Sequence, residues 1–176
     1  MHIFLSGIPG VGKSTIITSI TEKLPIEING FCTLAEKFEK CSSSYVYMYN
    51  IIKGNKDSRV AVAYRYGDGR FKGYKEAFDD FGSKTLSNLE GSDLIIMDEL
   101  GFMENEAKIF QEKVISVLNG NIPVLGVIKP MNTEFLNRIR NHKKVKVFDV
   151  NVENRNNLKE EVSKYLYESL NGKNIL

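Results

Sequence analysis

The sequence predicts an α/β protein, a three-layer sandwich in which helices cover both faces of a mainly parallel central sheet, with a small antiparallel β insertion. Two observations predict this class. Short apolar segments alternate with segments of helical apolar spacing along most of the chain, and this order is typical of parallel sheets. The first apolar segment, residues 2–5, runs into a glycine-rich turn that a helical segment follows at once. A strand, a turn and a helix in this arrangement form a recurring α/β unit.

The glycine-rich turn and the residues after it, GIPGVGKST at 7–15, have the spacing of a P-loop. Glycine bends at little steric cost, so backbone N–H groups can turn inward towards phosphate oxygens. Lys13 is expected to reach the β- and γ-phosphates as a catalytic group, and the Ser14 hydroxyl to bind Mg²⁺. The helix that opens at Thr15 also favours an anion at its amino terminus. The expected nucleotide-binding residues are Gly7, Ile8, Pro9, Gly10, Val11, Gly12, Lys13, Ser14 and Thr15.

Length and composition favour one compact domain over residues 1–176, with a mass of 19.9 kDa. The 24 lysines and arginines and 22 acidic residues give a net charge of +2, which favours neither a nucleic-acid protein nor a membrane-surface protein. Cys32 and Cys41 are too few for a disulfide framework; one bridge between them stays open, and reduced thiols are the simpler interpretation. No secretory signal is recognisable, and no segment approaches ~20 apolar residues. We therefore expect a cytoplasmic protein without a membrane span.

A β-rich insertion is predicted at about residues 27–70. Its segments are rich in β-forming residues and are separated by turns that contain glycine. Asn29-Gly30 is expected to interrupt the first of them. Tyr45, Tyr47 and Tyr49 alternate along the second and are expected to share one face. The three predicted strands are 26–33, 45–52 and 59–66.

The rest of the chain is expected to continue the parallel sheet. Residues 93–99 are an apolar segment that ends in two carboxylates, the pattern of a strand buried on both faces. Further strands are predicted at 122–128 and 145–150. Helical spacing predicts helices at about 74–89, 105–118, 133–140 and 154–170.

The two carboxylates, Asp98 and Glu99, are candidates for chemistry because they end a buried strand. Ligands of α/β proteins bind at that edge of the sheet. Asp98 is expected to hold Mg²⁺, directly or through water. Glu99 is expected to point elsewhere, since side chains alternate along a strand, and to orient or deprotonate a water as a catalytic group. The alternative is a solvated strand end without function.

Five segments together resemble a known family: GIPGVGKST, GFCT, LIIMDELGFMEN, IPVLGVI and VENRNNL. The chain is similar, over nearly all its residues, to the thermophile-type and cancer-related nucleoside-triphosphatases. The resemblance implies Mg²⁺-dependent hydrolysis of ATP, GTP and other nucleoside triphosphates to diphosphate and phosphate, on a RecA-like or kinase-like P-loop NTPase core. Phe102 departs from the family, which usually has a basic residue there.

The resemblance also implies roles for residues outside the P-loop. Arg155, which follows Asn154, is expected to contact the base or the phosphates, with helix capping and an exposed arginine as the alternative. Glu104 matches a carboxylate beside the site, although it would equally cap the following helix. Lys129 follows a buried strand; we interpret it as a surface lysine, with contact to the γ-phosphate as the alternative.

Two other functions stay open. A P-loop kinase would transfer the γ-phosphate to a nucleoside or small metabolite; Arg138 and Arg140 lie about 200° apart around a helix, so they do not form the paired arginines that such enzymes commonly use. A nucleotide-dependent switch or RNA-associated module has its support in the basic stretch 138–146. Nucleic acid is not favoured as a partner, whereas an activating protein partner stays open because no arginine finger is evident.

Overall fold

The computed structural model describes residues 1–22, 24–37 and 42–170. Within them, the strands form one eight-stranded sheet in the order β5-β4-β3-β2-β6-β7-β1-β8. The strands are β1 (His2–Ser6), β2 (Ile28–Lys37), β3 (Ser44–Ile52), β4 (Asn55–Arg65), β5 (Phe71–Gly73), β6 (Leu94–Leu100), β7 (Val124–Ile128) and β8 (Val145–Asp149). The helices are α1 (Lys13–Thr21), α2 (Lys75–Ala77), the π-helical turn η1 (Phe78–Gly82), α3 (Ser83–Thr85), α4 (Lys108–Asn119), α5 (Glu134–Arg140) and α6 (Arg155–Ser169).

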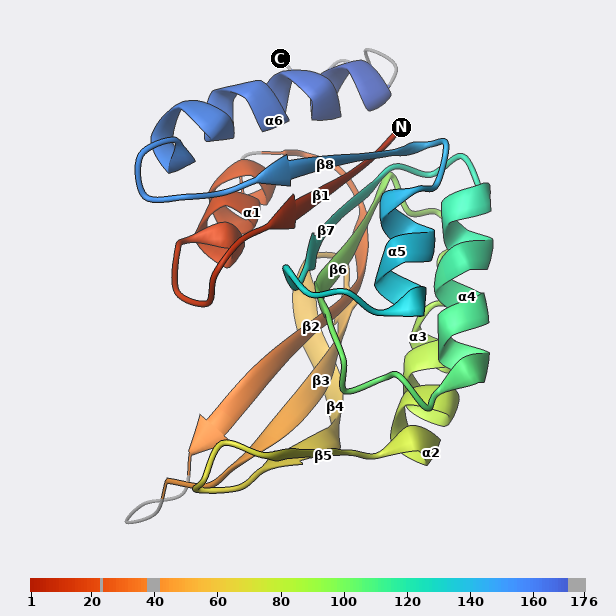
Figure 1. The fold of residues 1–176 in the computed structure, drawn as a ribbon. Coiled ribbons are helices and arrows are strands. Elements are labelled where there is room, and N and C mark those ends of the chain that lie inside the picture. Colours follow the sequence, from red (N-terminus) through yellow and green to blue (C-terminus); the bar gives the residue numbers. More distant parts are fainter. Residues whose placement is uncertain (23, 38–41, 171–176) are drawn as a thin grey trace.

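Helices cover both faces of the parallel part of the sheet, as Figure 1 shows. Helices α1 and α6 lie on one face, where a core forms around residues such as Ile3, Leu5 and Val162. Helices α2 to α5 lie on the other, where Phe4 and Phe110 belong to a second core. The predicted three-layer α/β sandwich with a mainly parallel sheet and an antiparallel portion is therefore confirmed.

Strands β2, β6, β7, β1 and β8 pair in parallel. All five residues of β1 and all five of β7 are buried, which explains their continuous apolar runs. Parallel strands end at the same edge of the sheet. The carboxyl ends of β6, β7 and β1, three neighbours, therefore lie side by side.

The antiparallel strands extend this same sheet, and β2 belongs to both parts. Its first half pairs in parallel with β6, and from Gly30 to Lys37 it pairs antiparallel with β3. The predicted interruption at Asn29-Gly30 is wrong, because β2 runs on for ten residues. Glycine is needed here because β2 and β6 approach each other closely: a Cβ at position 30 would lie 2.1 Å from the Ile96 carbonyl oxygen. The division into a single domain with an insertion at 27–70 stays a prediction.

The tyrosines of β3 share one face, as expected. Val46 and Met48 are buried on the side of the helices, whereas Tyr45, Tyr47 and Tyr49 are half-buried on the other side. The guanidinium of Arg59 stacks 4.3 Å from the centre of the Tyr47 ring. The tyrosines are thus used in cross-strand packing.

Two helix predictions need correction. The segment 74–89 is not one helix but α2, η1 and α3 in succession, with a π-helical turn at 78–82. The helix predicted from 105 begins only at Lys108, because residues 101–106 form turns after β6. Helix α5 begins as predicted, after Thr133, whose hydroxyl accepts a hydrogen bond of 3.2 Å from Leu136 N–H. Cys32 is a free thiol, while Cys41 lies outside the described residues.

The close approach of β2 to β6 predicts a severe effect for Gly30→Ala. Gly30 has a φ of +130° and backbone atoms of Ile96 fill the space of a side chain, so we expect a loss of more than about 3 kcal/mol in the free energy of unfolding. Gly91→Ala is the matched control: its φ is also positive, at +76°, but the space beside it is open, and it should cost only about 1 kcal/mol. Denaturant unfolding followed by circular dichroism measures both. Equal losses would contradict the role of close approach.

Candidate functional site

The P-loop connects β1 to α1 at the carboxyl edge of the sheet. Gly12 adopts a left-handed conformation with φ +110° just before the helix, and a Cβ at Gly7 would lie 2.4 Å from the Val150 carbonyl oxygen. Both glycines are therefore required by the backbone path. Lys13 is the first residue of α1, and only 6% of it is exposed.

The ammonium group of Lys13 is folded back on its own loop. It donates hydrogen bonds of 2.7 and 2.8 Å to the carbonyl oxygens of Gly7 and Ile8. Burial lowers the pKa of Lys13, and the nearby carboxylates of Glu99 and Asp98 oppose this shift. The loop, the lysine and the two predicted carboxylates are thus within electrostatic reach of one another.

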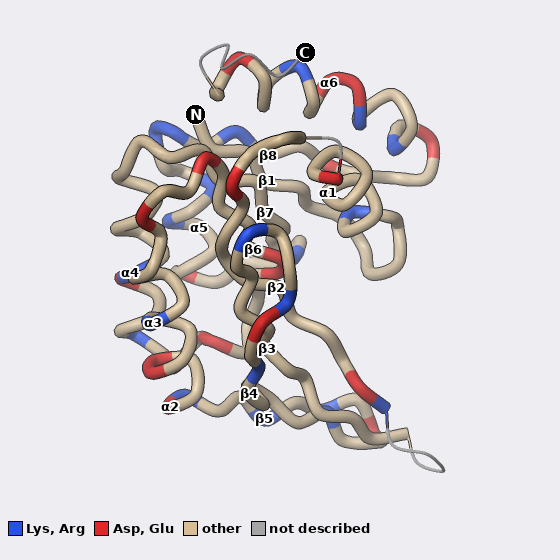
Figure 2. The backbone as a smooth tube through the Cα atoms, turned by 180° about the vertical axis from the view of Figure 1, so that it is seen from behind, with Lys and Arg blue, Asp and Glu red and all other residues tan. Residues whose placement is uncertain are grey.

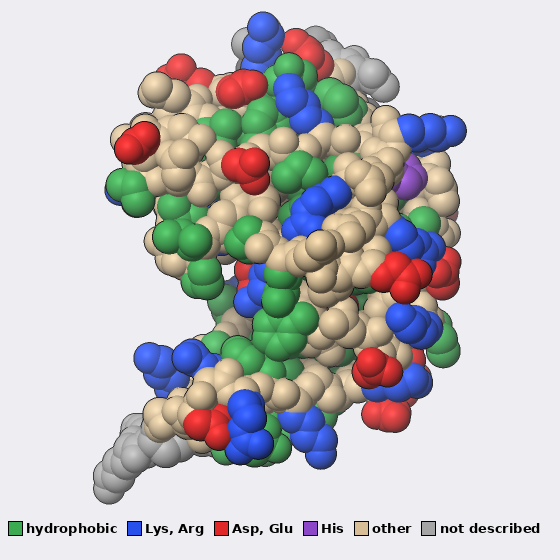
Figure 3. All heavy atoms as spheres, in the orientation of Figure 1, with side chains coloured by type: hydrophobic (Ala, Val, Ile, Leu, Met, Phe, Trp, Pro, Cys, Tyr) green, Lys and Arg blue, Asp and Glu red, His purple; other side chains and the backbone are tan. Residues whose placement is uncertain are grey.

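A cavity of about 330 Å³ lies between the P-loop and the end of β6. In the space-filling view, the molecule is hollowed on the side between the P-loop and the antiparallel strands (Figure 3). The 330 Å³ cavity is lined by residues of the P-loop, of the start of α1, of β2 and of β6: Pro9, Gly10, Gly12, Lys13, Ser14, Thr15, Thr33, Asp98 and Glu99. The structure therefore brings most of the predicted site residues to one place.

Asp98 and Glu99 both line this cavity, and the expectation that their side chains point in different directions stays a prediction. The regular register between β6 and β7 is lost between Met97 and Leu100. The Glu99 N–H donates to the hydroxyl of Thr33 at 3.2 Å. Thr33 is a neighbour that strand order provides, since β2 pairs with β6.

Asp98 and Ser14 have the chemistry of a divalent-metal site. Burial raises the pKa of Asp98, while a hydrogen bond from the Ser14 hydroxyl opposes this shift. A carboxylate and a hydroxyl in contact supply the hard oxygen ligands that Mg²⁺ prefers. No cluster of three or more histidine, cysteine or acidic side chains suited to a metal occurs in residues 1–22, 24–37 and 42–170.

Lys129 is not the surface lysine that we predicted. Its ammonium forms an ion pair of 2.7 Å with Glu99 Oε1, and the exposed fractions of the two side chains are only 22% and 26%. It is placed there because β7, which it follows, lies between β1 and β6. The sequence did not predict this ion pair because strand order cannot be read from local pattern, and contact of Lys129 with the γ-phosphate stays a prediction.

Glu104 is buried behind the site rather than capping a helix. One carboxyl oxygen accepts a hydrogen bond of 2.5 Å from Gly101 N–H, whereas α4 has Ala107 as its N-cap and no side-chain cap. The other oxygen, Oε2, has no hydrogen-bond partner in the described part of the chain. Burial raises the pKa of Glu104 to about 7. Glu104 therefore fixes the turn that follows Glu99.

Arg155 lines a different cavity from the two carboxylates. It begins α6 and lines a cavity of about 480 Å³ together with Gly12 and Thr15. The side chain of Asn154 donates to the Asp149 carbonyl oxygen at 2.8 Å and accepts from Asn151 N–H at 2.9 Å. Asn154 thus shapes the loop that presents Arg155, rather than capping α6 with its side chain.

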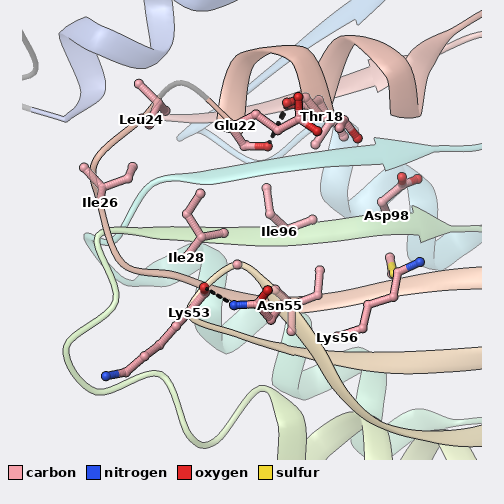
Figure 4. A pocket seen from close by; sticks show the side chains of 15 residues that line it. Thr18, Glu22, Leu24, Ile26, Ile28, Lys53, Asn55, Lys56, Ile96 and Asp98 are labelled. Atoms are coloured by element: carbon pink, nitrogen blue, oxygen red, sulfur yellow. Dashed lines mark hydrogen bonds between the residues drawn. The ribbon is translucent and has the colours of Figure 1, made fainter.

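A further cavity of about 380 Å³ extends from Asp98 beneath α1. Figure 4 shows Ile28 and Ile96 on its sheet side, Asp98 at one end, and the Lys53 side chain directed away from it. At the Lys53 end, Asn55 donates to the Lys53 carbonyl oxygen at 3.1 Å. Asp98 also lines the cavity between the P-loop and β6. The two cavities therefore meet at that carboxylate.

Fold and site together define a P-loop nucleotide-binding protein. The chain belongs to the NTPase family, whose model matches residues 2–163, and the resemblance noted in the sequence is confirmed. The nucleoside-triphosphatase THEP1 of Methanocaldococcus jannaschii is 32% identical over 171 residues, which cover 92% of this chain and 95% of that protein. The human cancer-related nucleoside-triphosphatase is 31% identical over 179 residues, covering 89% and 92%.

Solved structures of relatives have the same fold. The crystal structure of THEP1 from the hyperthermophile Aquifex aeolicus matches with a TM-score of 0.74 at 22% identity, covering 94% of this chain and 99% of that chain. The solution structure of the human cancer-related nucleoside triphosphatase matches with a TM-score of 0.71 at 25% identity, covering 96% and 98%.

The buried carboxyl of Glu104 predicts a pH-dependent stability. Its pKa rises from an ordinary 4.5 to about 7 on folding. Between these values the unfolded chain loses the proton first, so stability falls as pH rises. We expect the wild type to lose roughly 1–3 kcal/mol in the free energy of unfolding relative to Glu104→Gln between about pH 4.5 and 7. Urea unfolding of both proteins across this range measures the difference; a difference that does not change with pH contradicts the prediction.

Proposed function

We propose that the protein hydrolyses nucleoside triphosphates, ATP and GTP among them, to nucleoside diphosphate and phosphate. One observation carries the proposal: Lys13, the Ser14–Asp98 pair and Glu99 line a single cavity beside the P-loop. Membership of the NTPase family and the names of the relatives support it. Nothing in the described part of the chain, or in the names of these relatives, favours transfer of phosphate to another acceptor.

Each residue has a proposed role. The amides of the loop and the ammonium of Lys13 bind the phosphates. Ser14 and Asp98 hold Mg²⁺, which supplies charge neutralisation on the β- and γ-phosphates. Glu99 orients a water and accepts its proton as the water oxygen bonds to the γ-phosphorus. The bond from that phosphorus to the bridging oxygen breaks, and the diphosphate leaves with the electron pair.

The nucleoside is proposed to occupy the hollow beside Arg155. That cavity adjoins the P-loop through Gly12 and Thr15, which places it next to the phosphates. Its lining includes the side chains of Ile16, Asn156 and Lys159. A loose base preference is proposed from the resemblance to the family.

The basic stretch 138–146 gives little support to the kinase or RNA alternatives. Arg138 pairs with Glu112 at 2.6 Å, and Arg140 donates to the Lys129 carbonyl oxygen at 2.6 Å. Lys144 donates to the Asn119 carbonyl oxygen at 2.7 Å. These cations are engaged within the fold. Figure 2 shows basic and acidic positions interspersed along the chain, in keeping with its balanced charge.

Turnover is proposed to be slow. Among the described residues that line the phosphate cavity, none is an arginine, and Arg155 lines the neighbouring one. An arginine supplied by a protein partner would raise the rate, since arginine fingers contribute ~10³–10⁵-fold in related chemistry. In the described residues no helix has the length and apolar character to cross a membrane. The cytoplasmic location stays a prediction from the sequence.

Phosphate release from ATP, GTP, CTP and UTP with Mg²⁺ tests this function. We expect the wild type to hydrolyse several of them. Glu99→Gln should keep nucleotide affinity but lose about 10²–10⁴-fold in kcat, whereas Lys13→Ala should lose binding as well, because its charge contacts the phosphates. A wild type that binds nucleotide without releasing phosphate would contradict the hydrolase proposal. A Glu99→Gln variant that keeps its turnover would contradict the assignment of Glu99 as the general base.

The proposed metal ligands predict a change in Mg²⁺ dependence. In Asp98→Asn and Ser14→Ala, half-maximal turnover should need about 10-fold or more Mg²⁺ than in the wild type, since each loses an oxygen ligand or its charge. Titration of phosphate release against Mg²⁺ at saturating nucleotide measures this. Asp93→Asn, which changes a carboxylate at the opposite end of β6, is the control. Unchanged Mg²⁺ dependence in both site variants would refute the assignment.

A further inference from the structure

Lys129 is held by its backbone between the P-loop strand and the carboxylates. Its N–H donates to the Leu100 carbonyl oxygen at 2.9 Å. Its own carbonyl oxygen accepts from Met131 N–H at 2.8 Å and from Arg140 Nη2 at 2.6 Å. This residue follows β7, whose neighbours in the sheet are β1 and β6.

The side chain of Lys129 also has defined contacts, with Gly101 and Phe102. A Cβ at Gly101 would lie 2.9 Å from Lys129 Cδ and 3.0 Å from Cε, so the lysine stem rests on a backbone that has no side chain there. The ring of Phe102 lies 5.6 Å from the ammonium nitrogen, measured to the ring centre. The stem therefore has a defined path along the loop after β6, and its end meets Glu99 at 2.7 Å.

Glu99 connects Lys129 to the phosphate cavity. Glu99 lines that cavity together with Lys13, and its carboxylate pairs with the Lys129 ammonium at 2.7 Å. Burial lowers the pKa of Lys13; the carboxylates of Glu99 and Asp98 oppose this shift, and the charge of Lys129 adds to it. A triphosphate in the cavity would bring the negative charge of its γ-phosphate towards the carboxylate with which Lys129 pairs.

We propose that Lys129 binds the γ-phosphate and, in doing so, releases Glu99. With a diphosphate bound, Lys129 stays paired with Glu99, because no γ-phosphate competes for it. With a triphosphate bound, the lysine side chain turns from the carboxylate to the γ-phosphate oxygens, and the freed carboxylate holds the water. Lys129 then couples recognition of the third phosphate to the readiness of the base. This inference rests on the proposed hydrolase function of the same site.

A purely structural role for the ion pair makes a different prediction. If Lys129 only fixed Glu99, its removal would change the binding of triphosphate and diphosphate alike, or of neither. If it only restrained Glu99, its removal would raise turnover. Contact with the γ-phosphate instead predicts a loss confined to ligands that carry that group, together with lower turnover.

The experiment compares Lys129→Met, which keeps most of the stem but not the charge, with Lys129→Arg, which keeps the charge. Lys84→Met, at an exposed lysine of α3, is the matched control. Isothermal titration with Mg²⁺ measures the Kd of adenosine 5′-(β,γ-imido)triphosphate and of ADP. We expect Lys129→Met to weaken the triphosphate analogue about 10- to 100-fold and ADP by less than about 2-fold, the loss of one charge-assisted contact. Lys129→Arg should recover most of the affinity, and Lys84→Met should resemble the wild type.

Two results would overturn the inference: equal weakening of both ligands in Lys129→Met, or no weakening of either. A kcat for Lys129→Met above that of the wild type would also overturn it. Failure of the hydrolase proposal can be told apart from failure of this inference. If the wild type releases no phosphate yet the selective loss in Kd is seen, the γ-phosphate contact stands without hydrolysis. If hydrolysis is normal and no selective loss occurs, the contact alone is wrong.

Discussion

Parallel pairing of three neighbouring strands, β6, β7 and β1, is the constraint on which the site depends. Each strand brings its carboxyl end to the same edge of the sheet, and each ends in a different chemical group. Strand β1 leads into the P-loop and Lys13, β6 ends near Asp98 and Glu99, and β7 is followed by Lys129. These groups come from distant parts of the sequence. The pairing places Lys13, Asp98 and Glu99 around one cavity, and it places Lys129 in an ion pair with Glu99.

The charges at this edge are partly buried, and their mutual contacts offset the cost of taking them from water. Lys13 donates to carbonyl oxygens of its own loop, while Lys129 pairs with Glu99. Behind them, Glu104 holds the turn at Gly101 with one carboxyl oxygen. A phosphate chain entering the cavity would offer the ammonium groups of Lys13 and Lys129 charge-assisted hydrogen bonds to phosphate oxygens.

The sequence predicted the features that follow from local chemistry. The P-loop could be recognised because glycine spacing and a lysine act within a few residues, and the buried strands could be recognised from their apolar runs. Gly30 was misinterpreted because glycine in a turn and glycine at a close approach between strands give the same local pattern. The position of Lys129 could not be derived, since it depends on strand order.

A crystal structure with adenosine 5′-(β,γ-imido)triphosphate and Mg²⁺ tests the central claim most directly, namely that the cavity between the P-loop and β6 binds the triphosphate. The account predicts that the phosphates lie in this cavity, that Lys13 leaves the Gly7 and Ile8 carbonyl oxygens for phosphate oxygens, and that Ser14 and Asp98 meet the metal. Phosphates bound instead in the hollow beneath α1, with Lys13 still on its own loop, would contradict it.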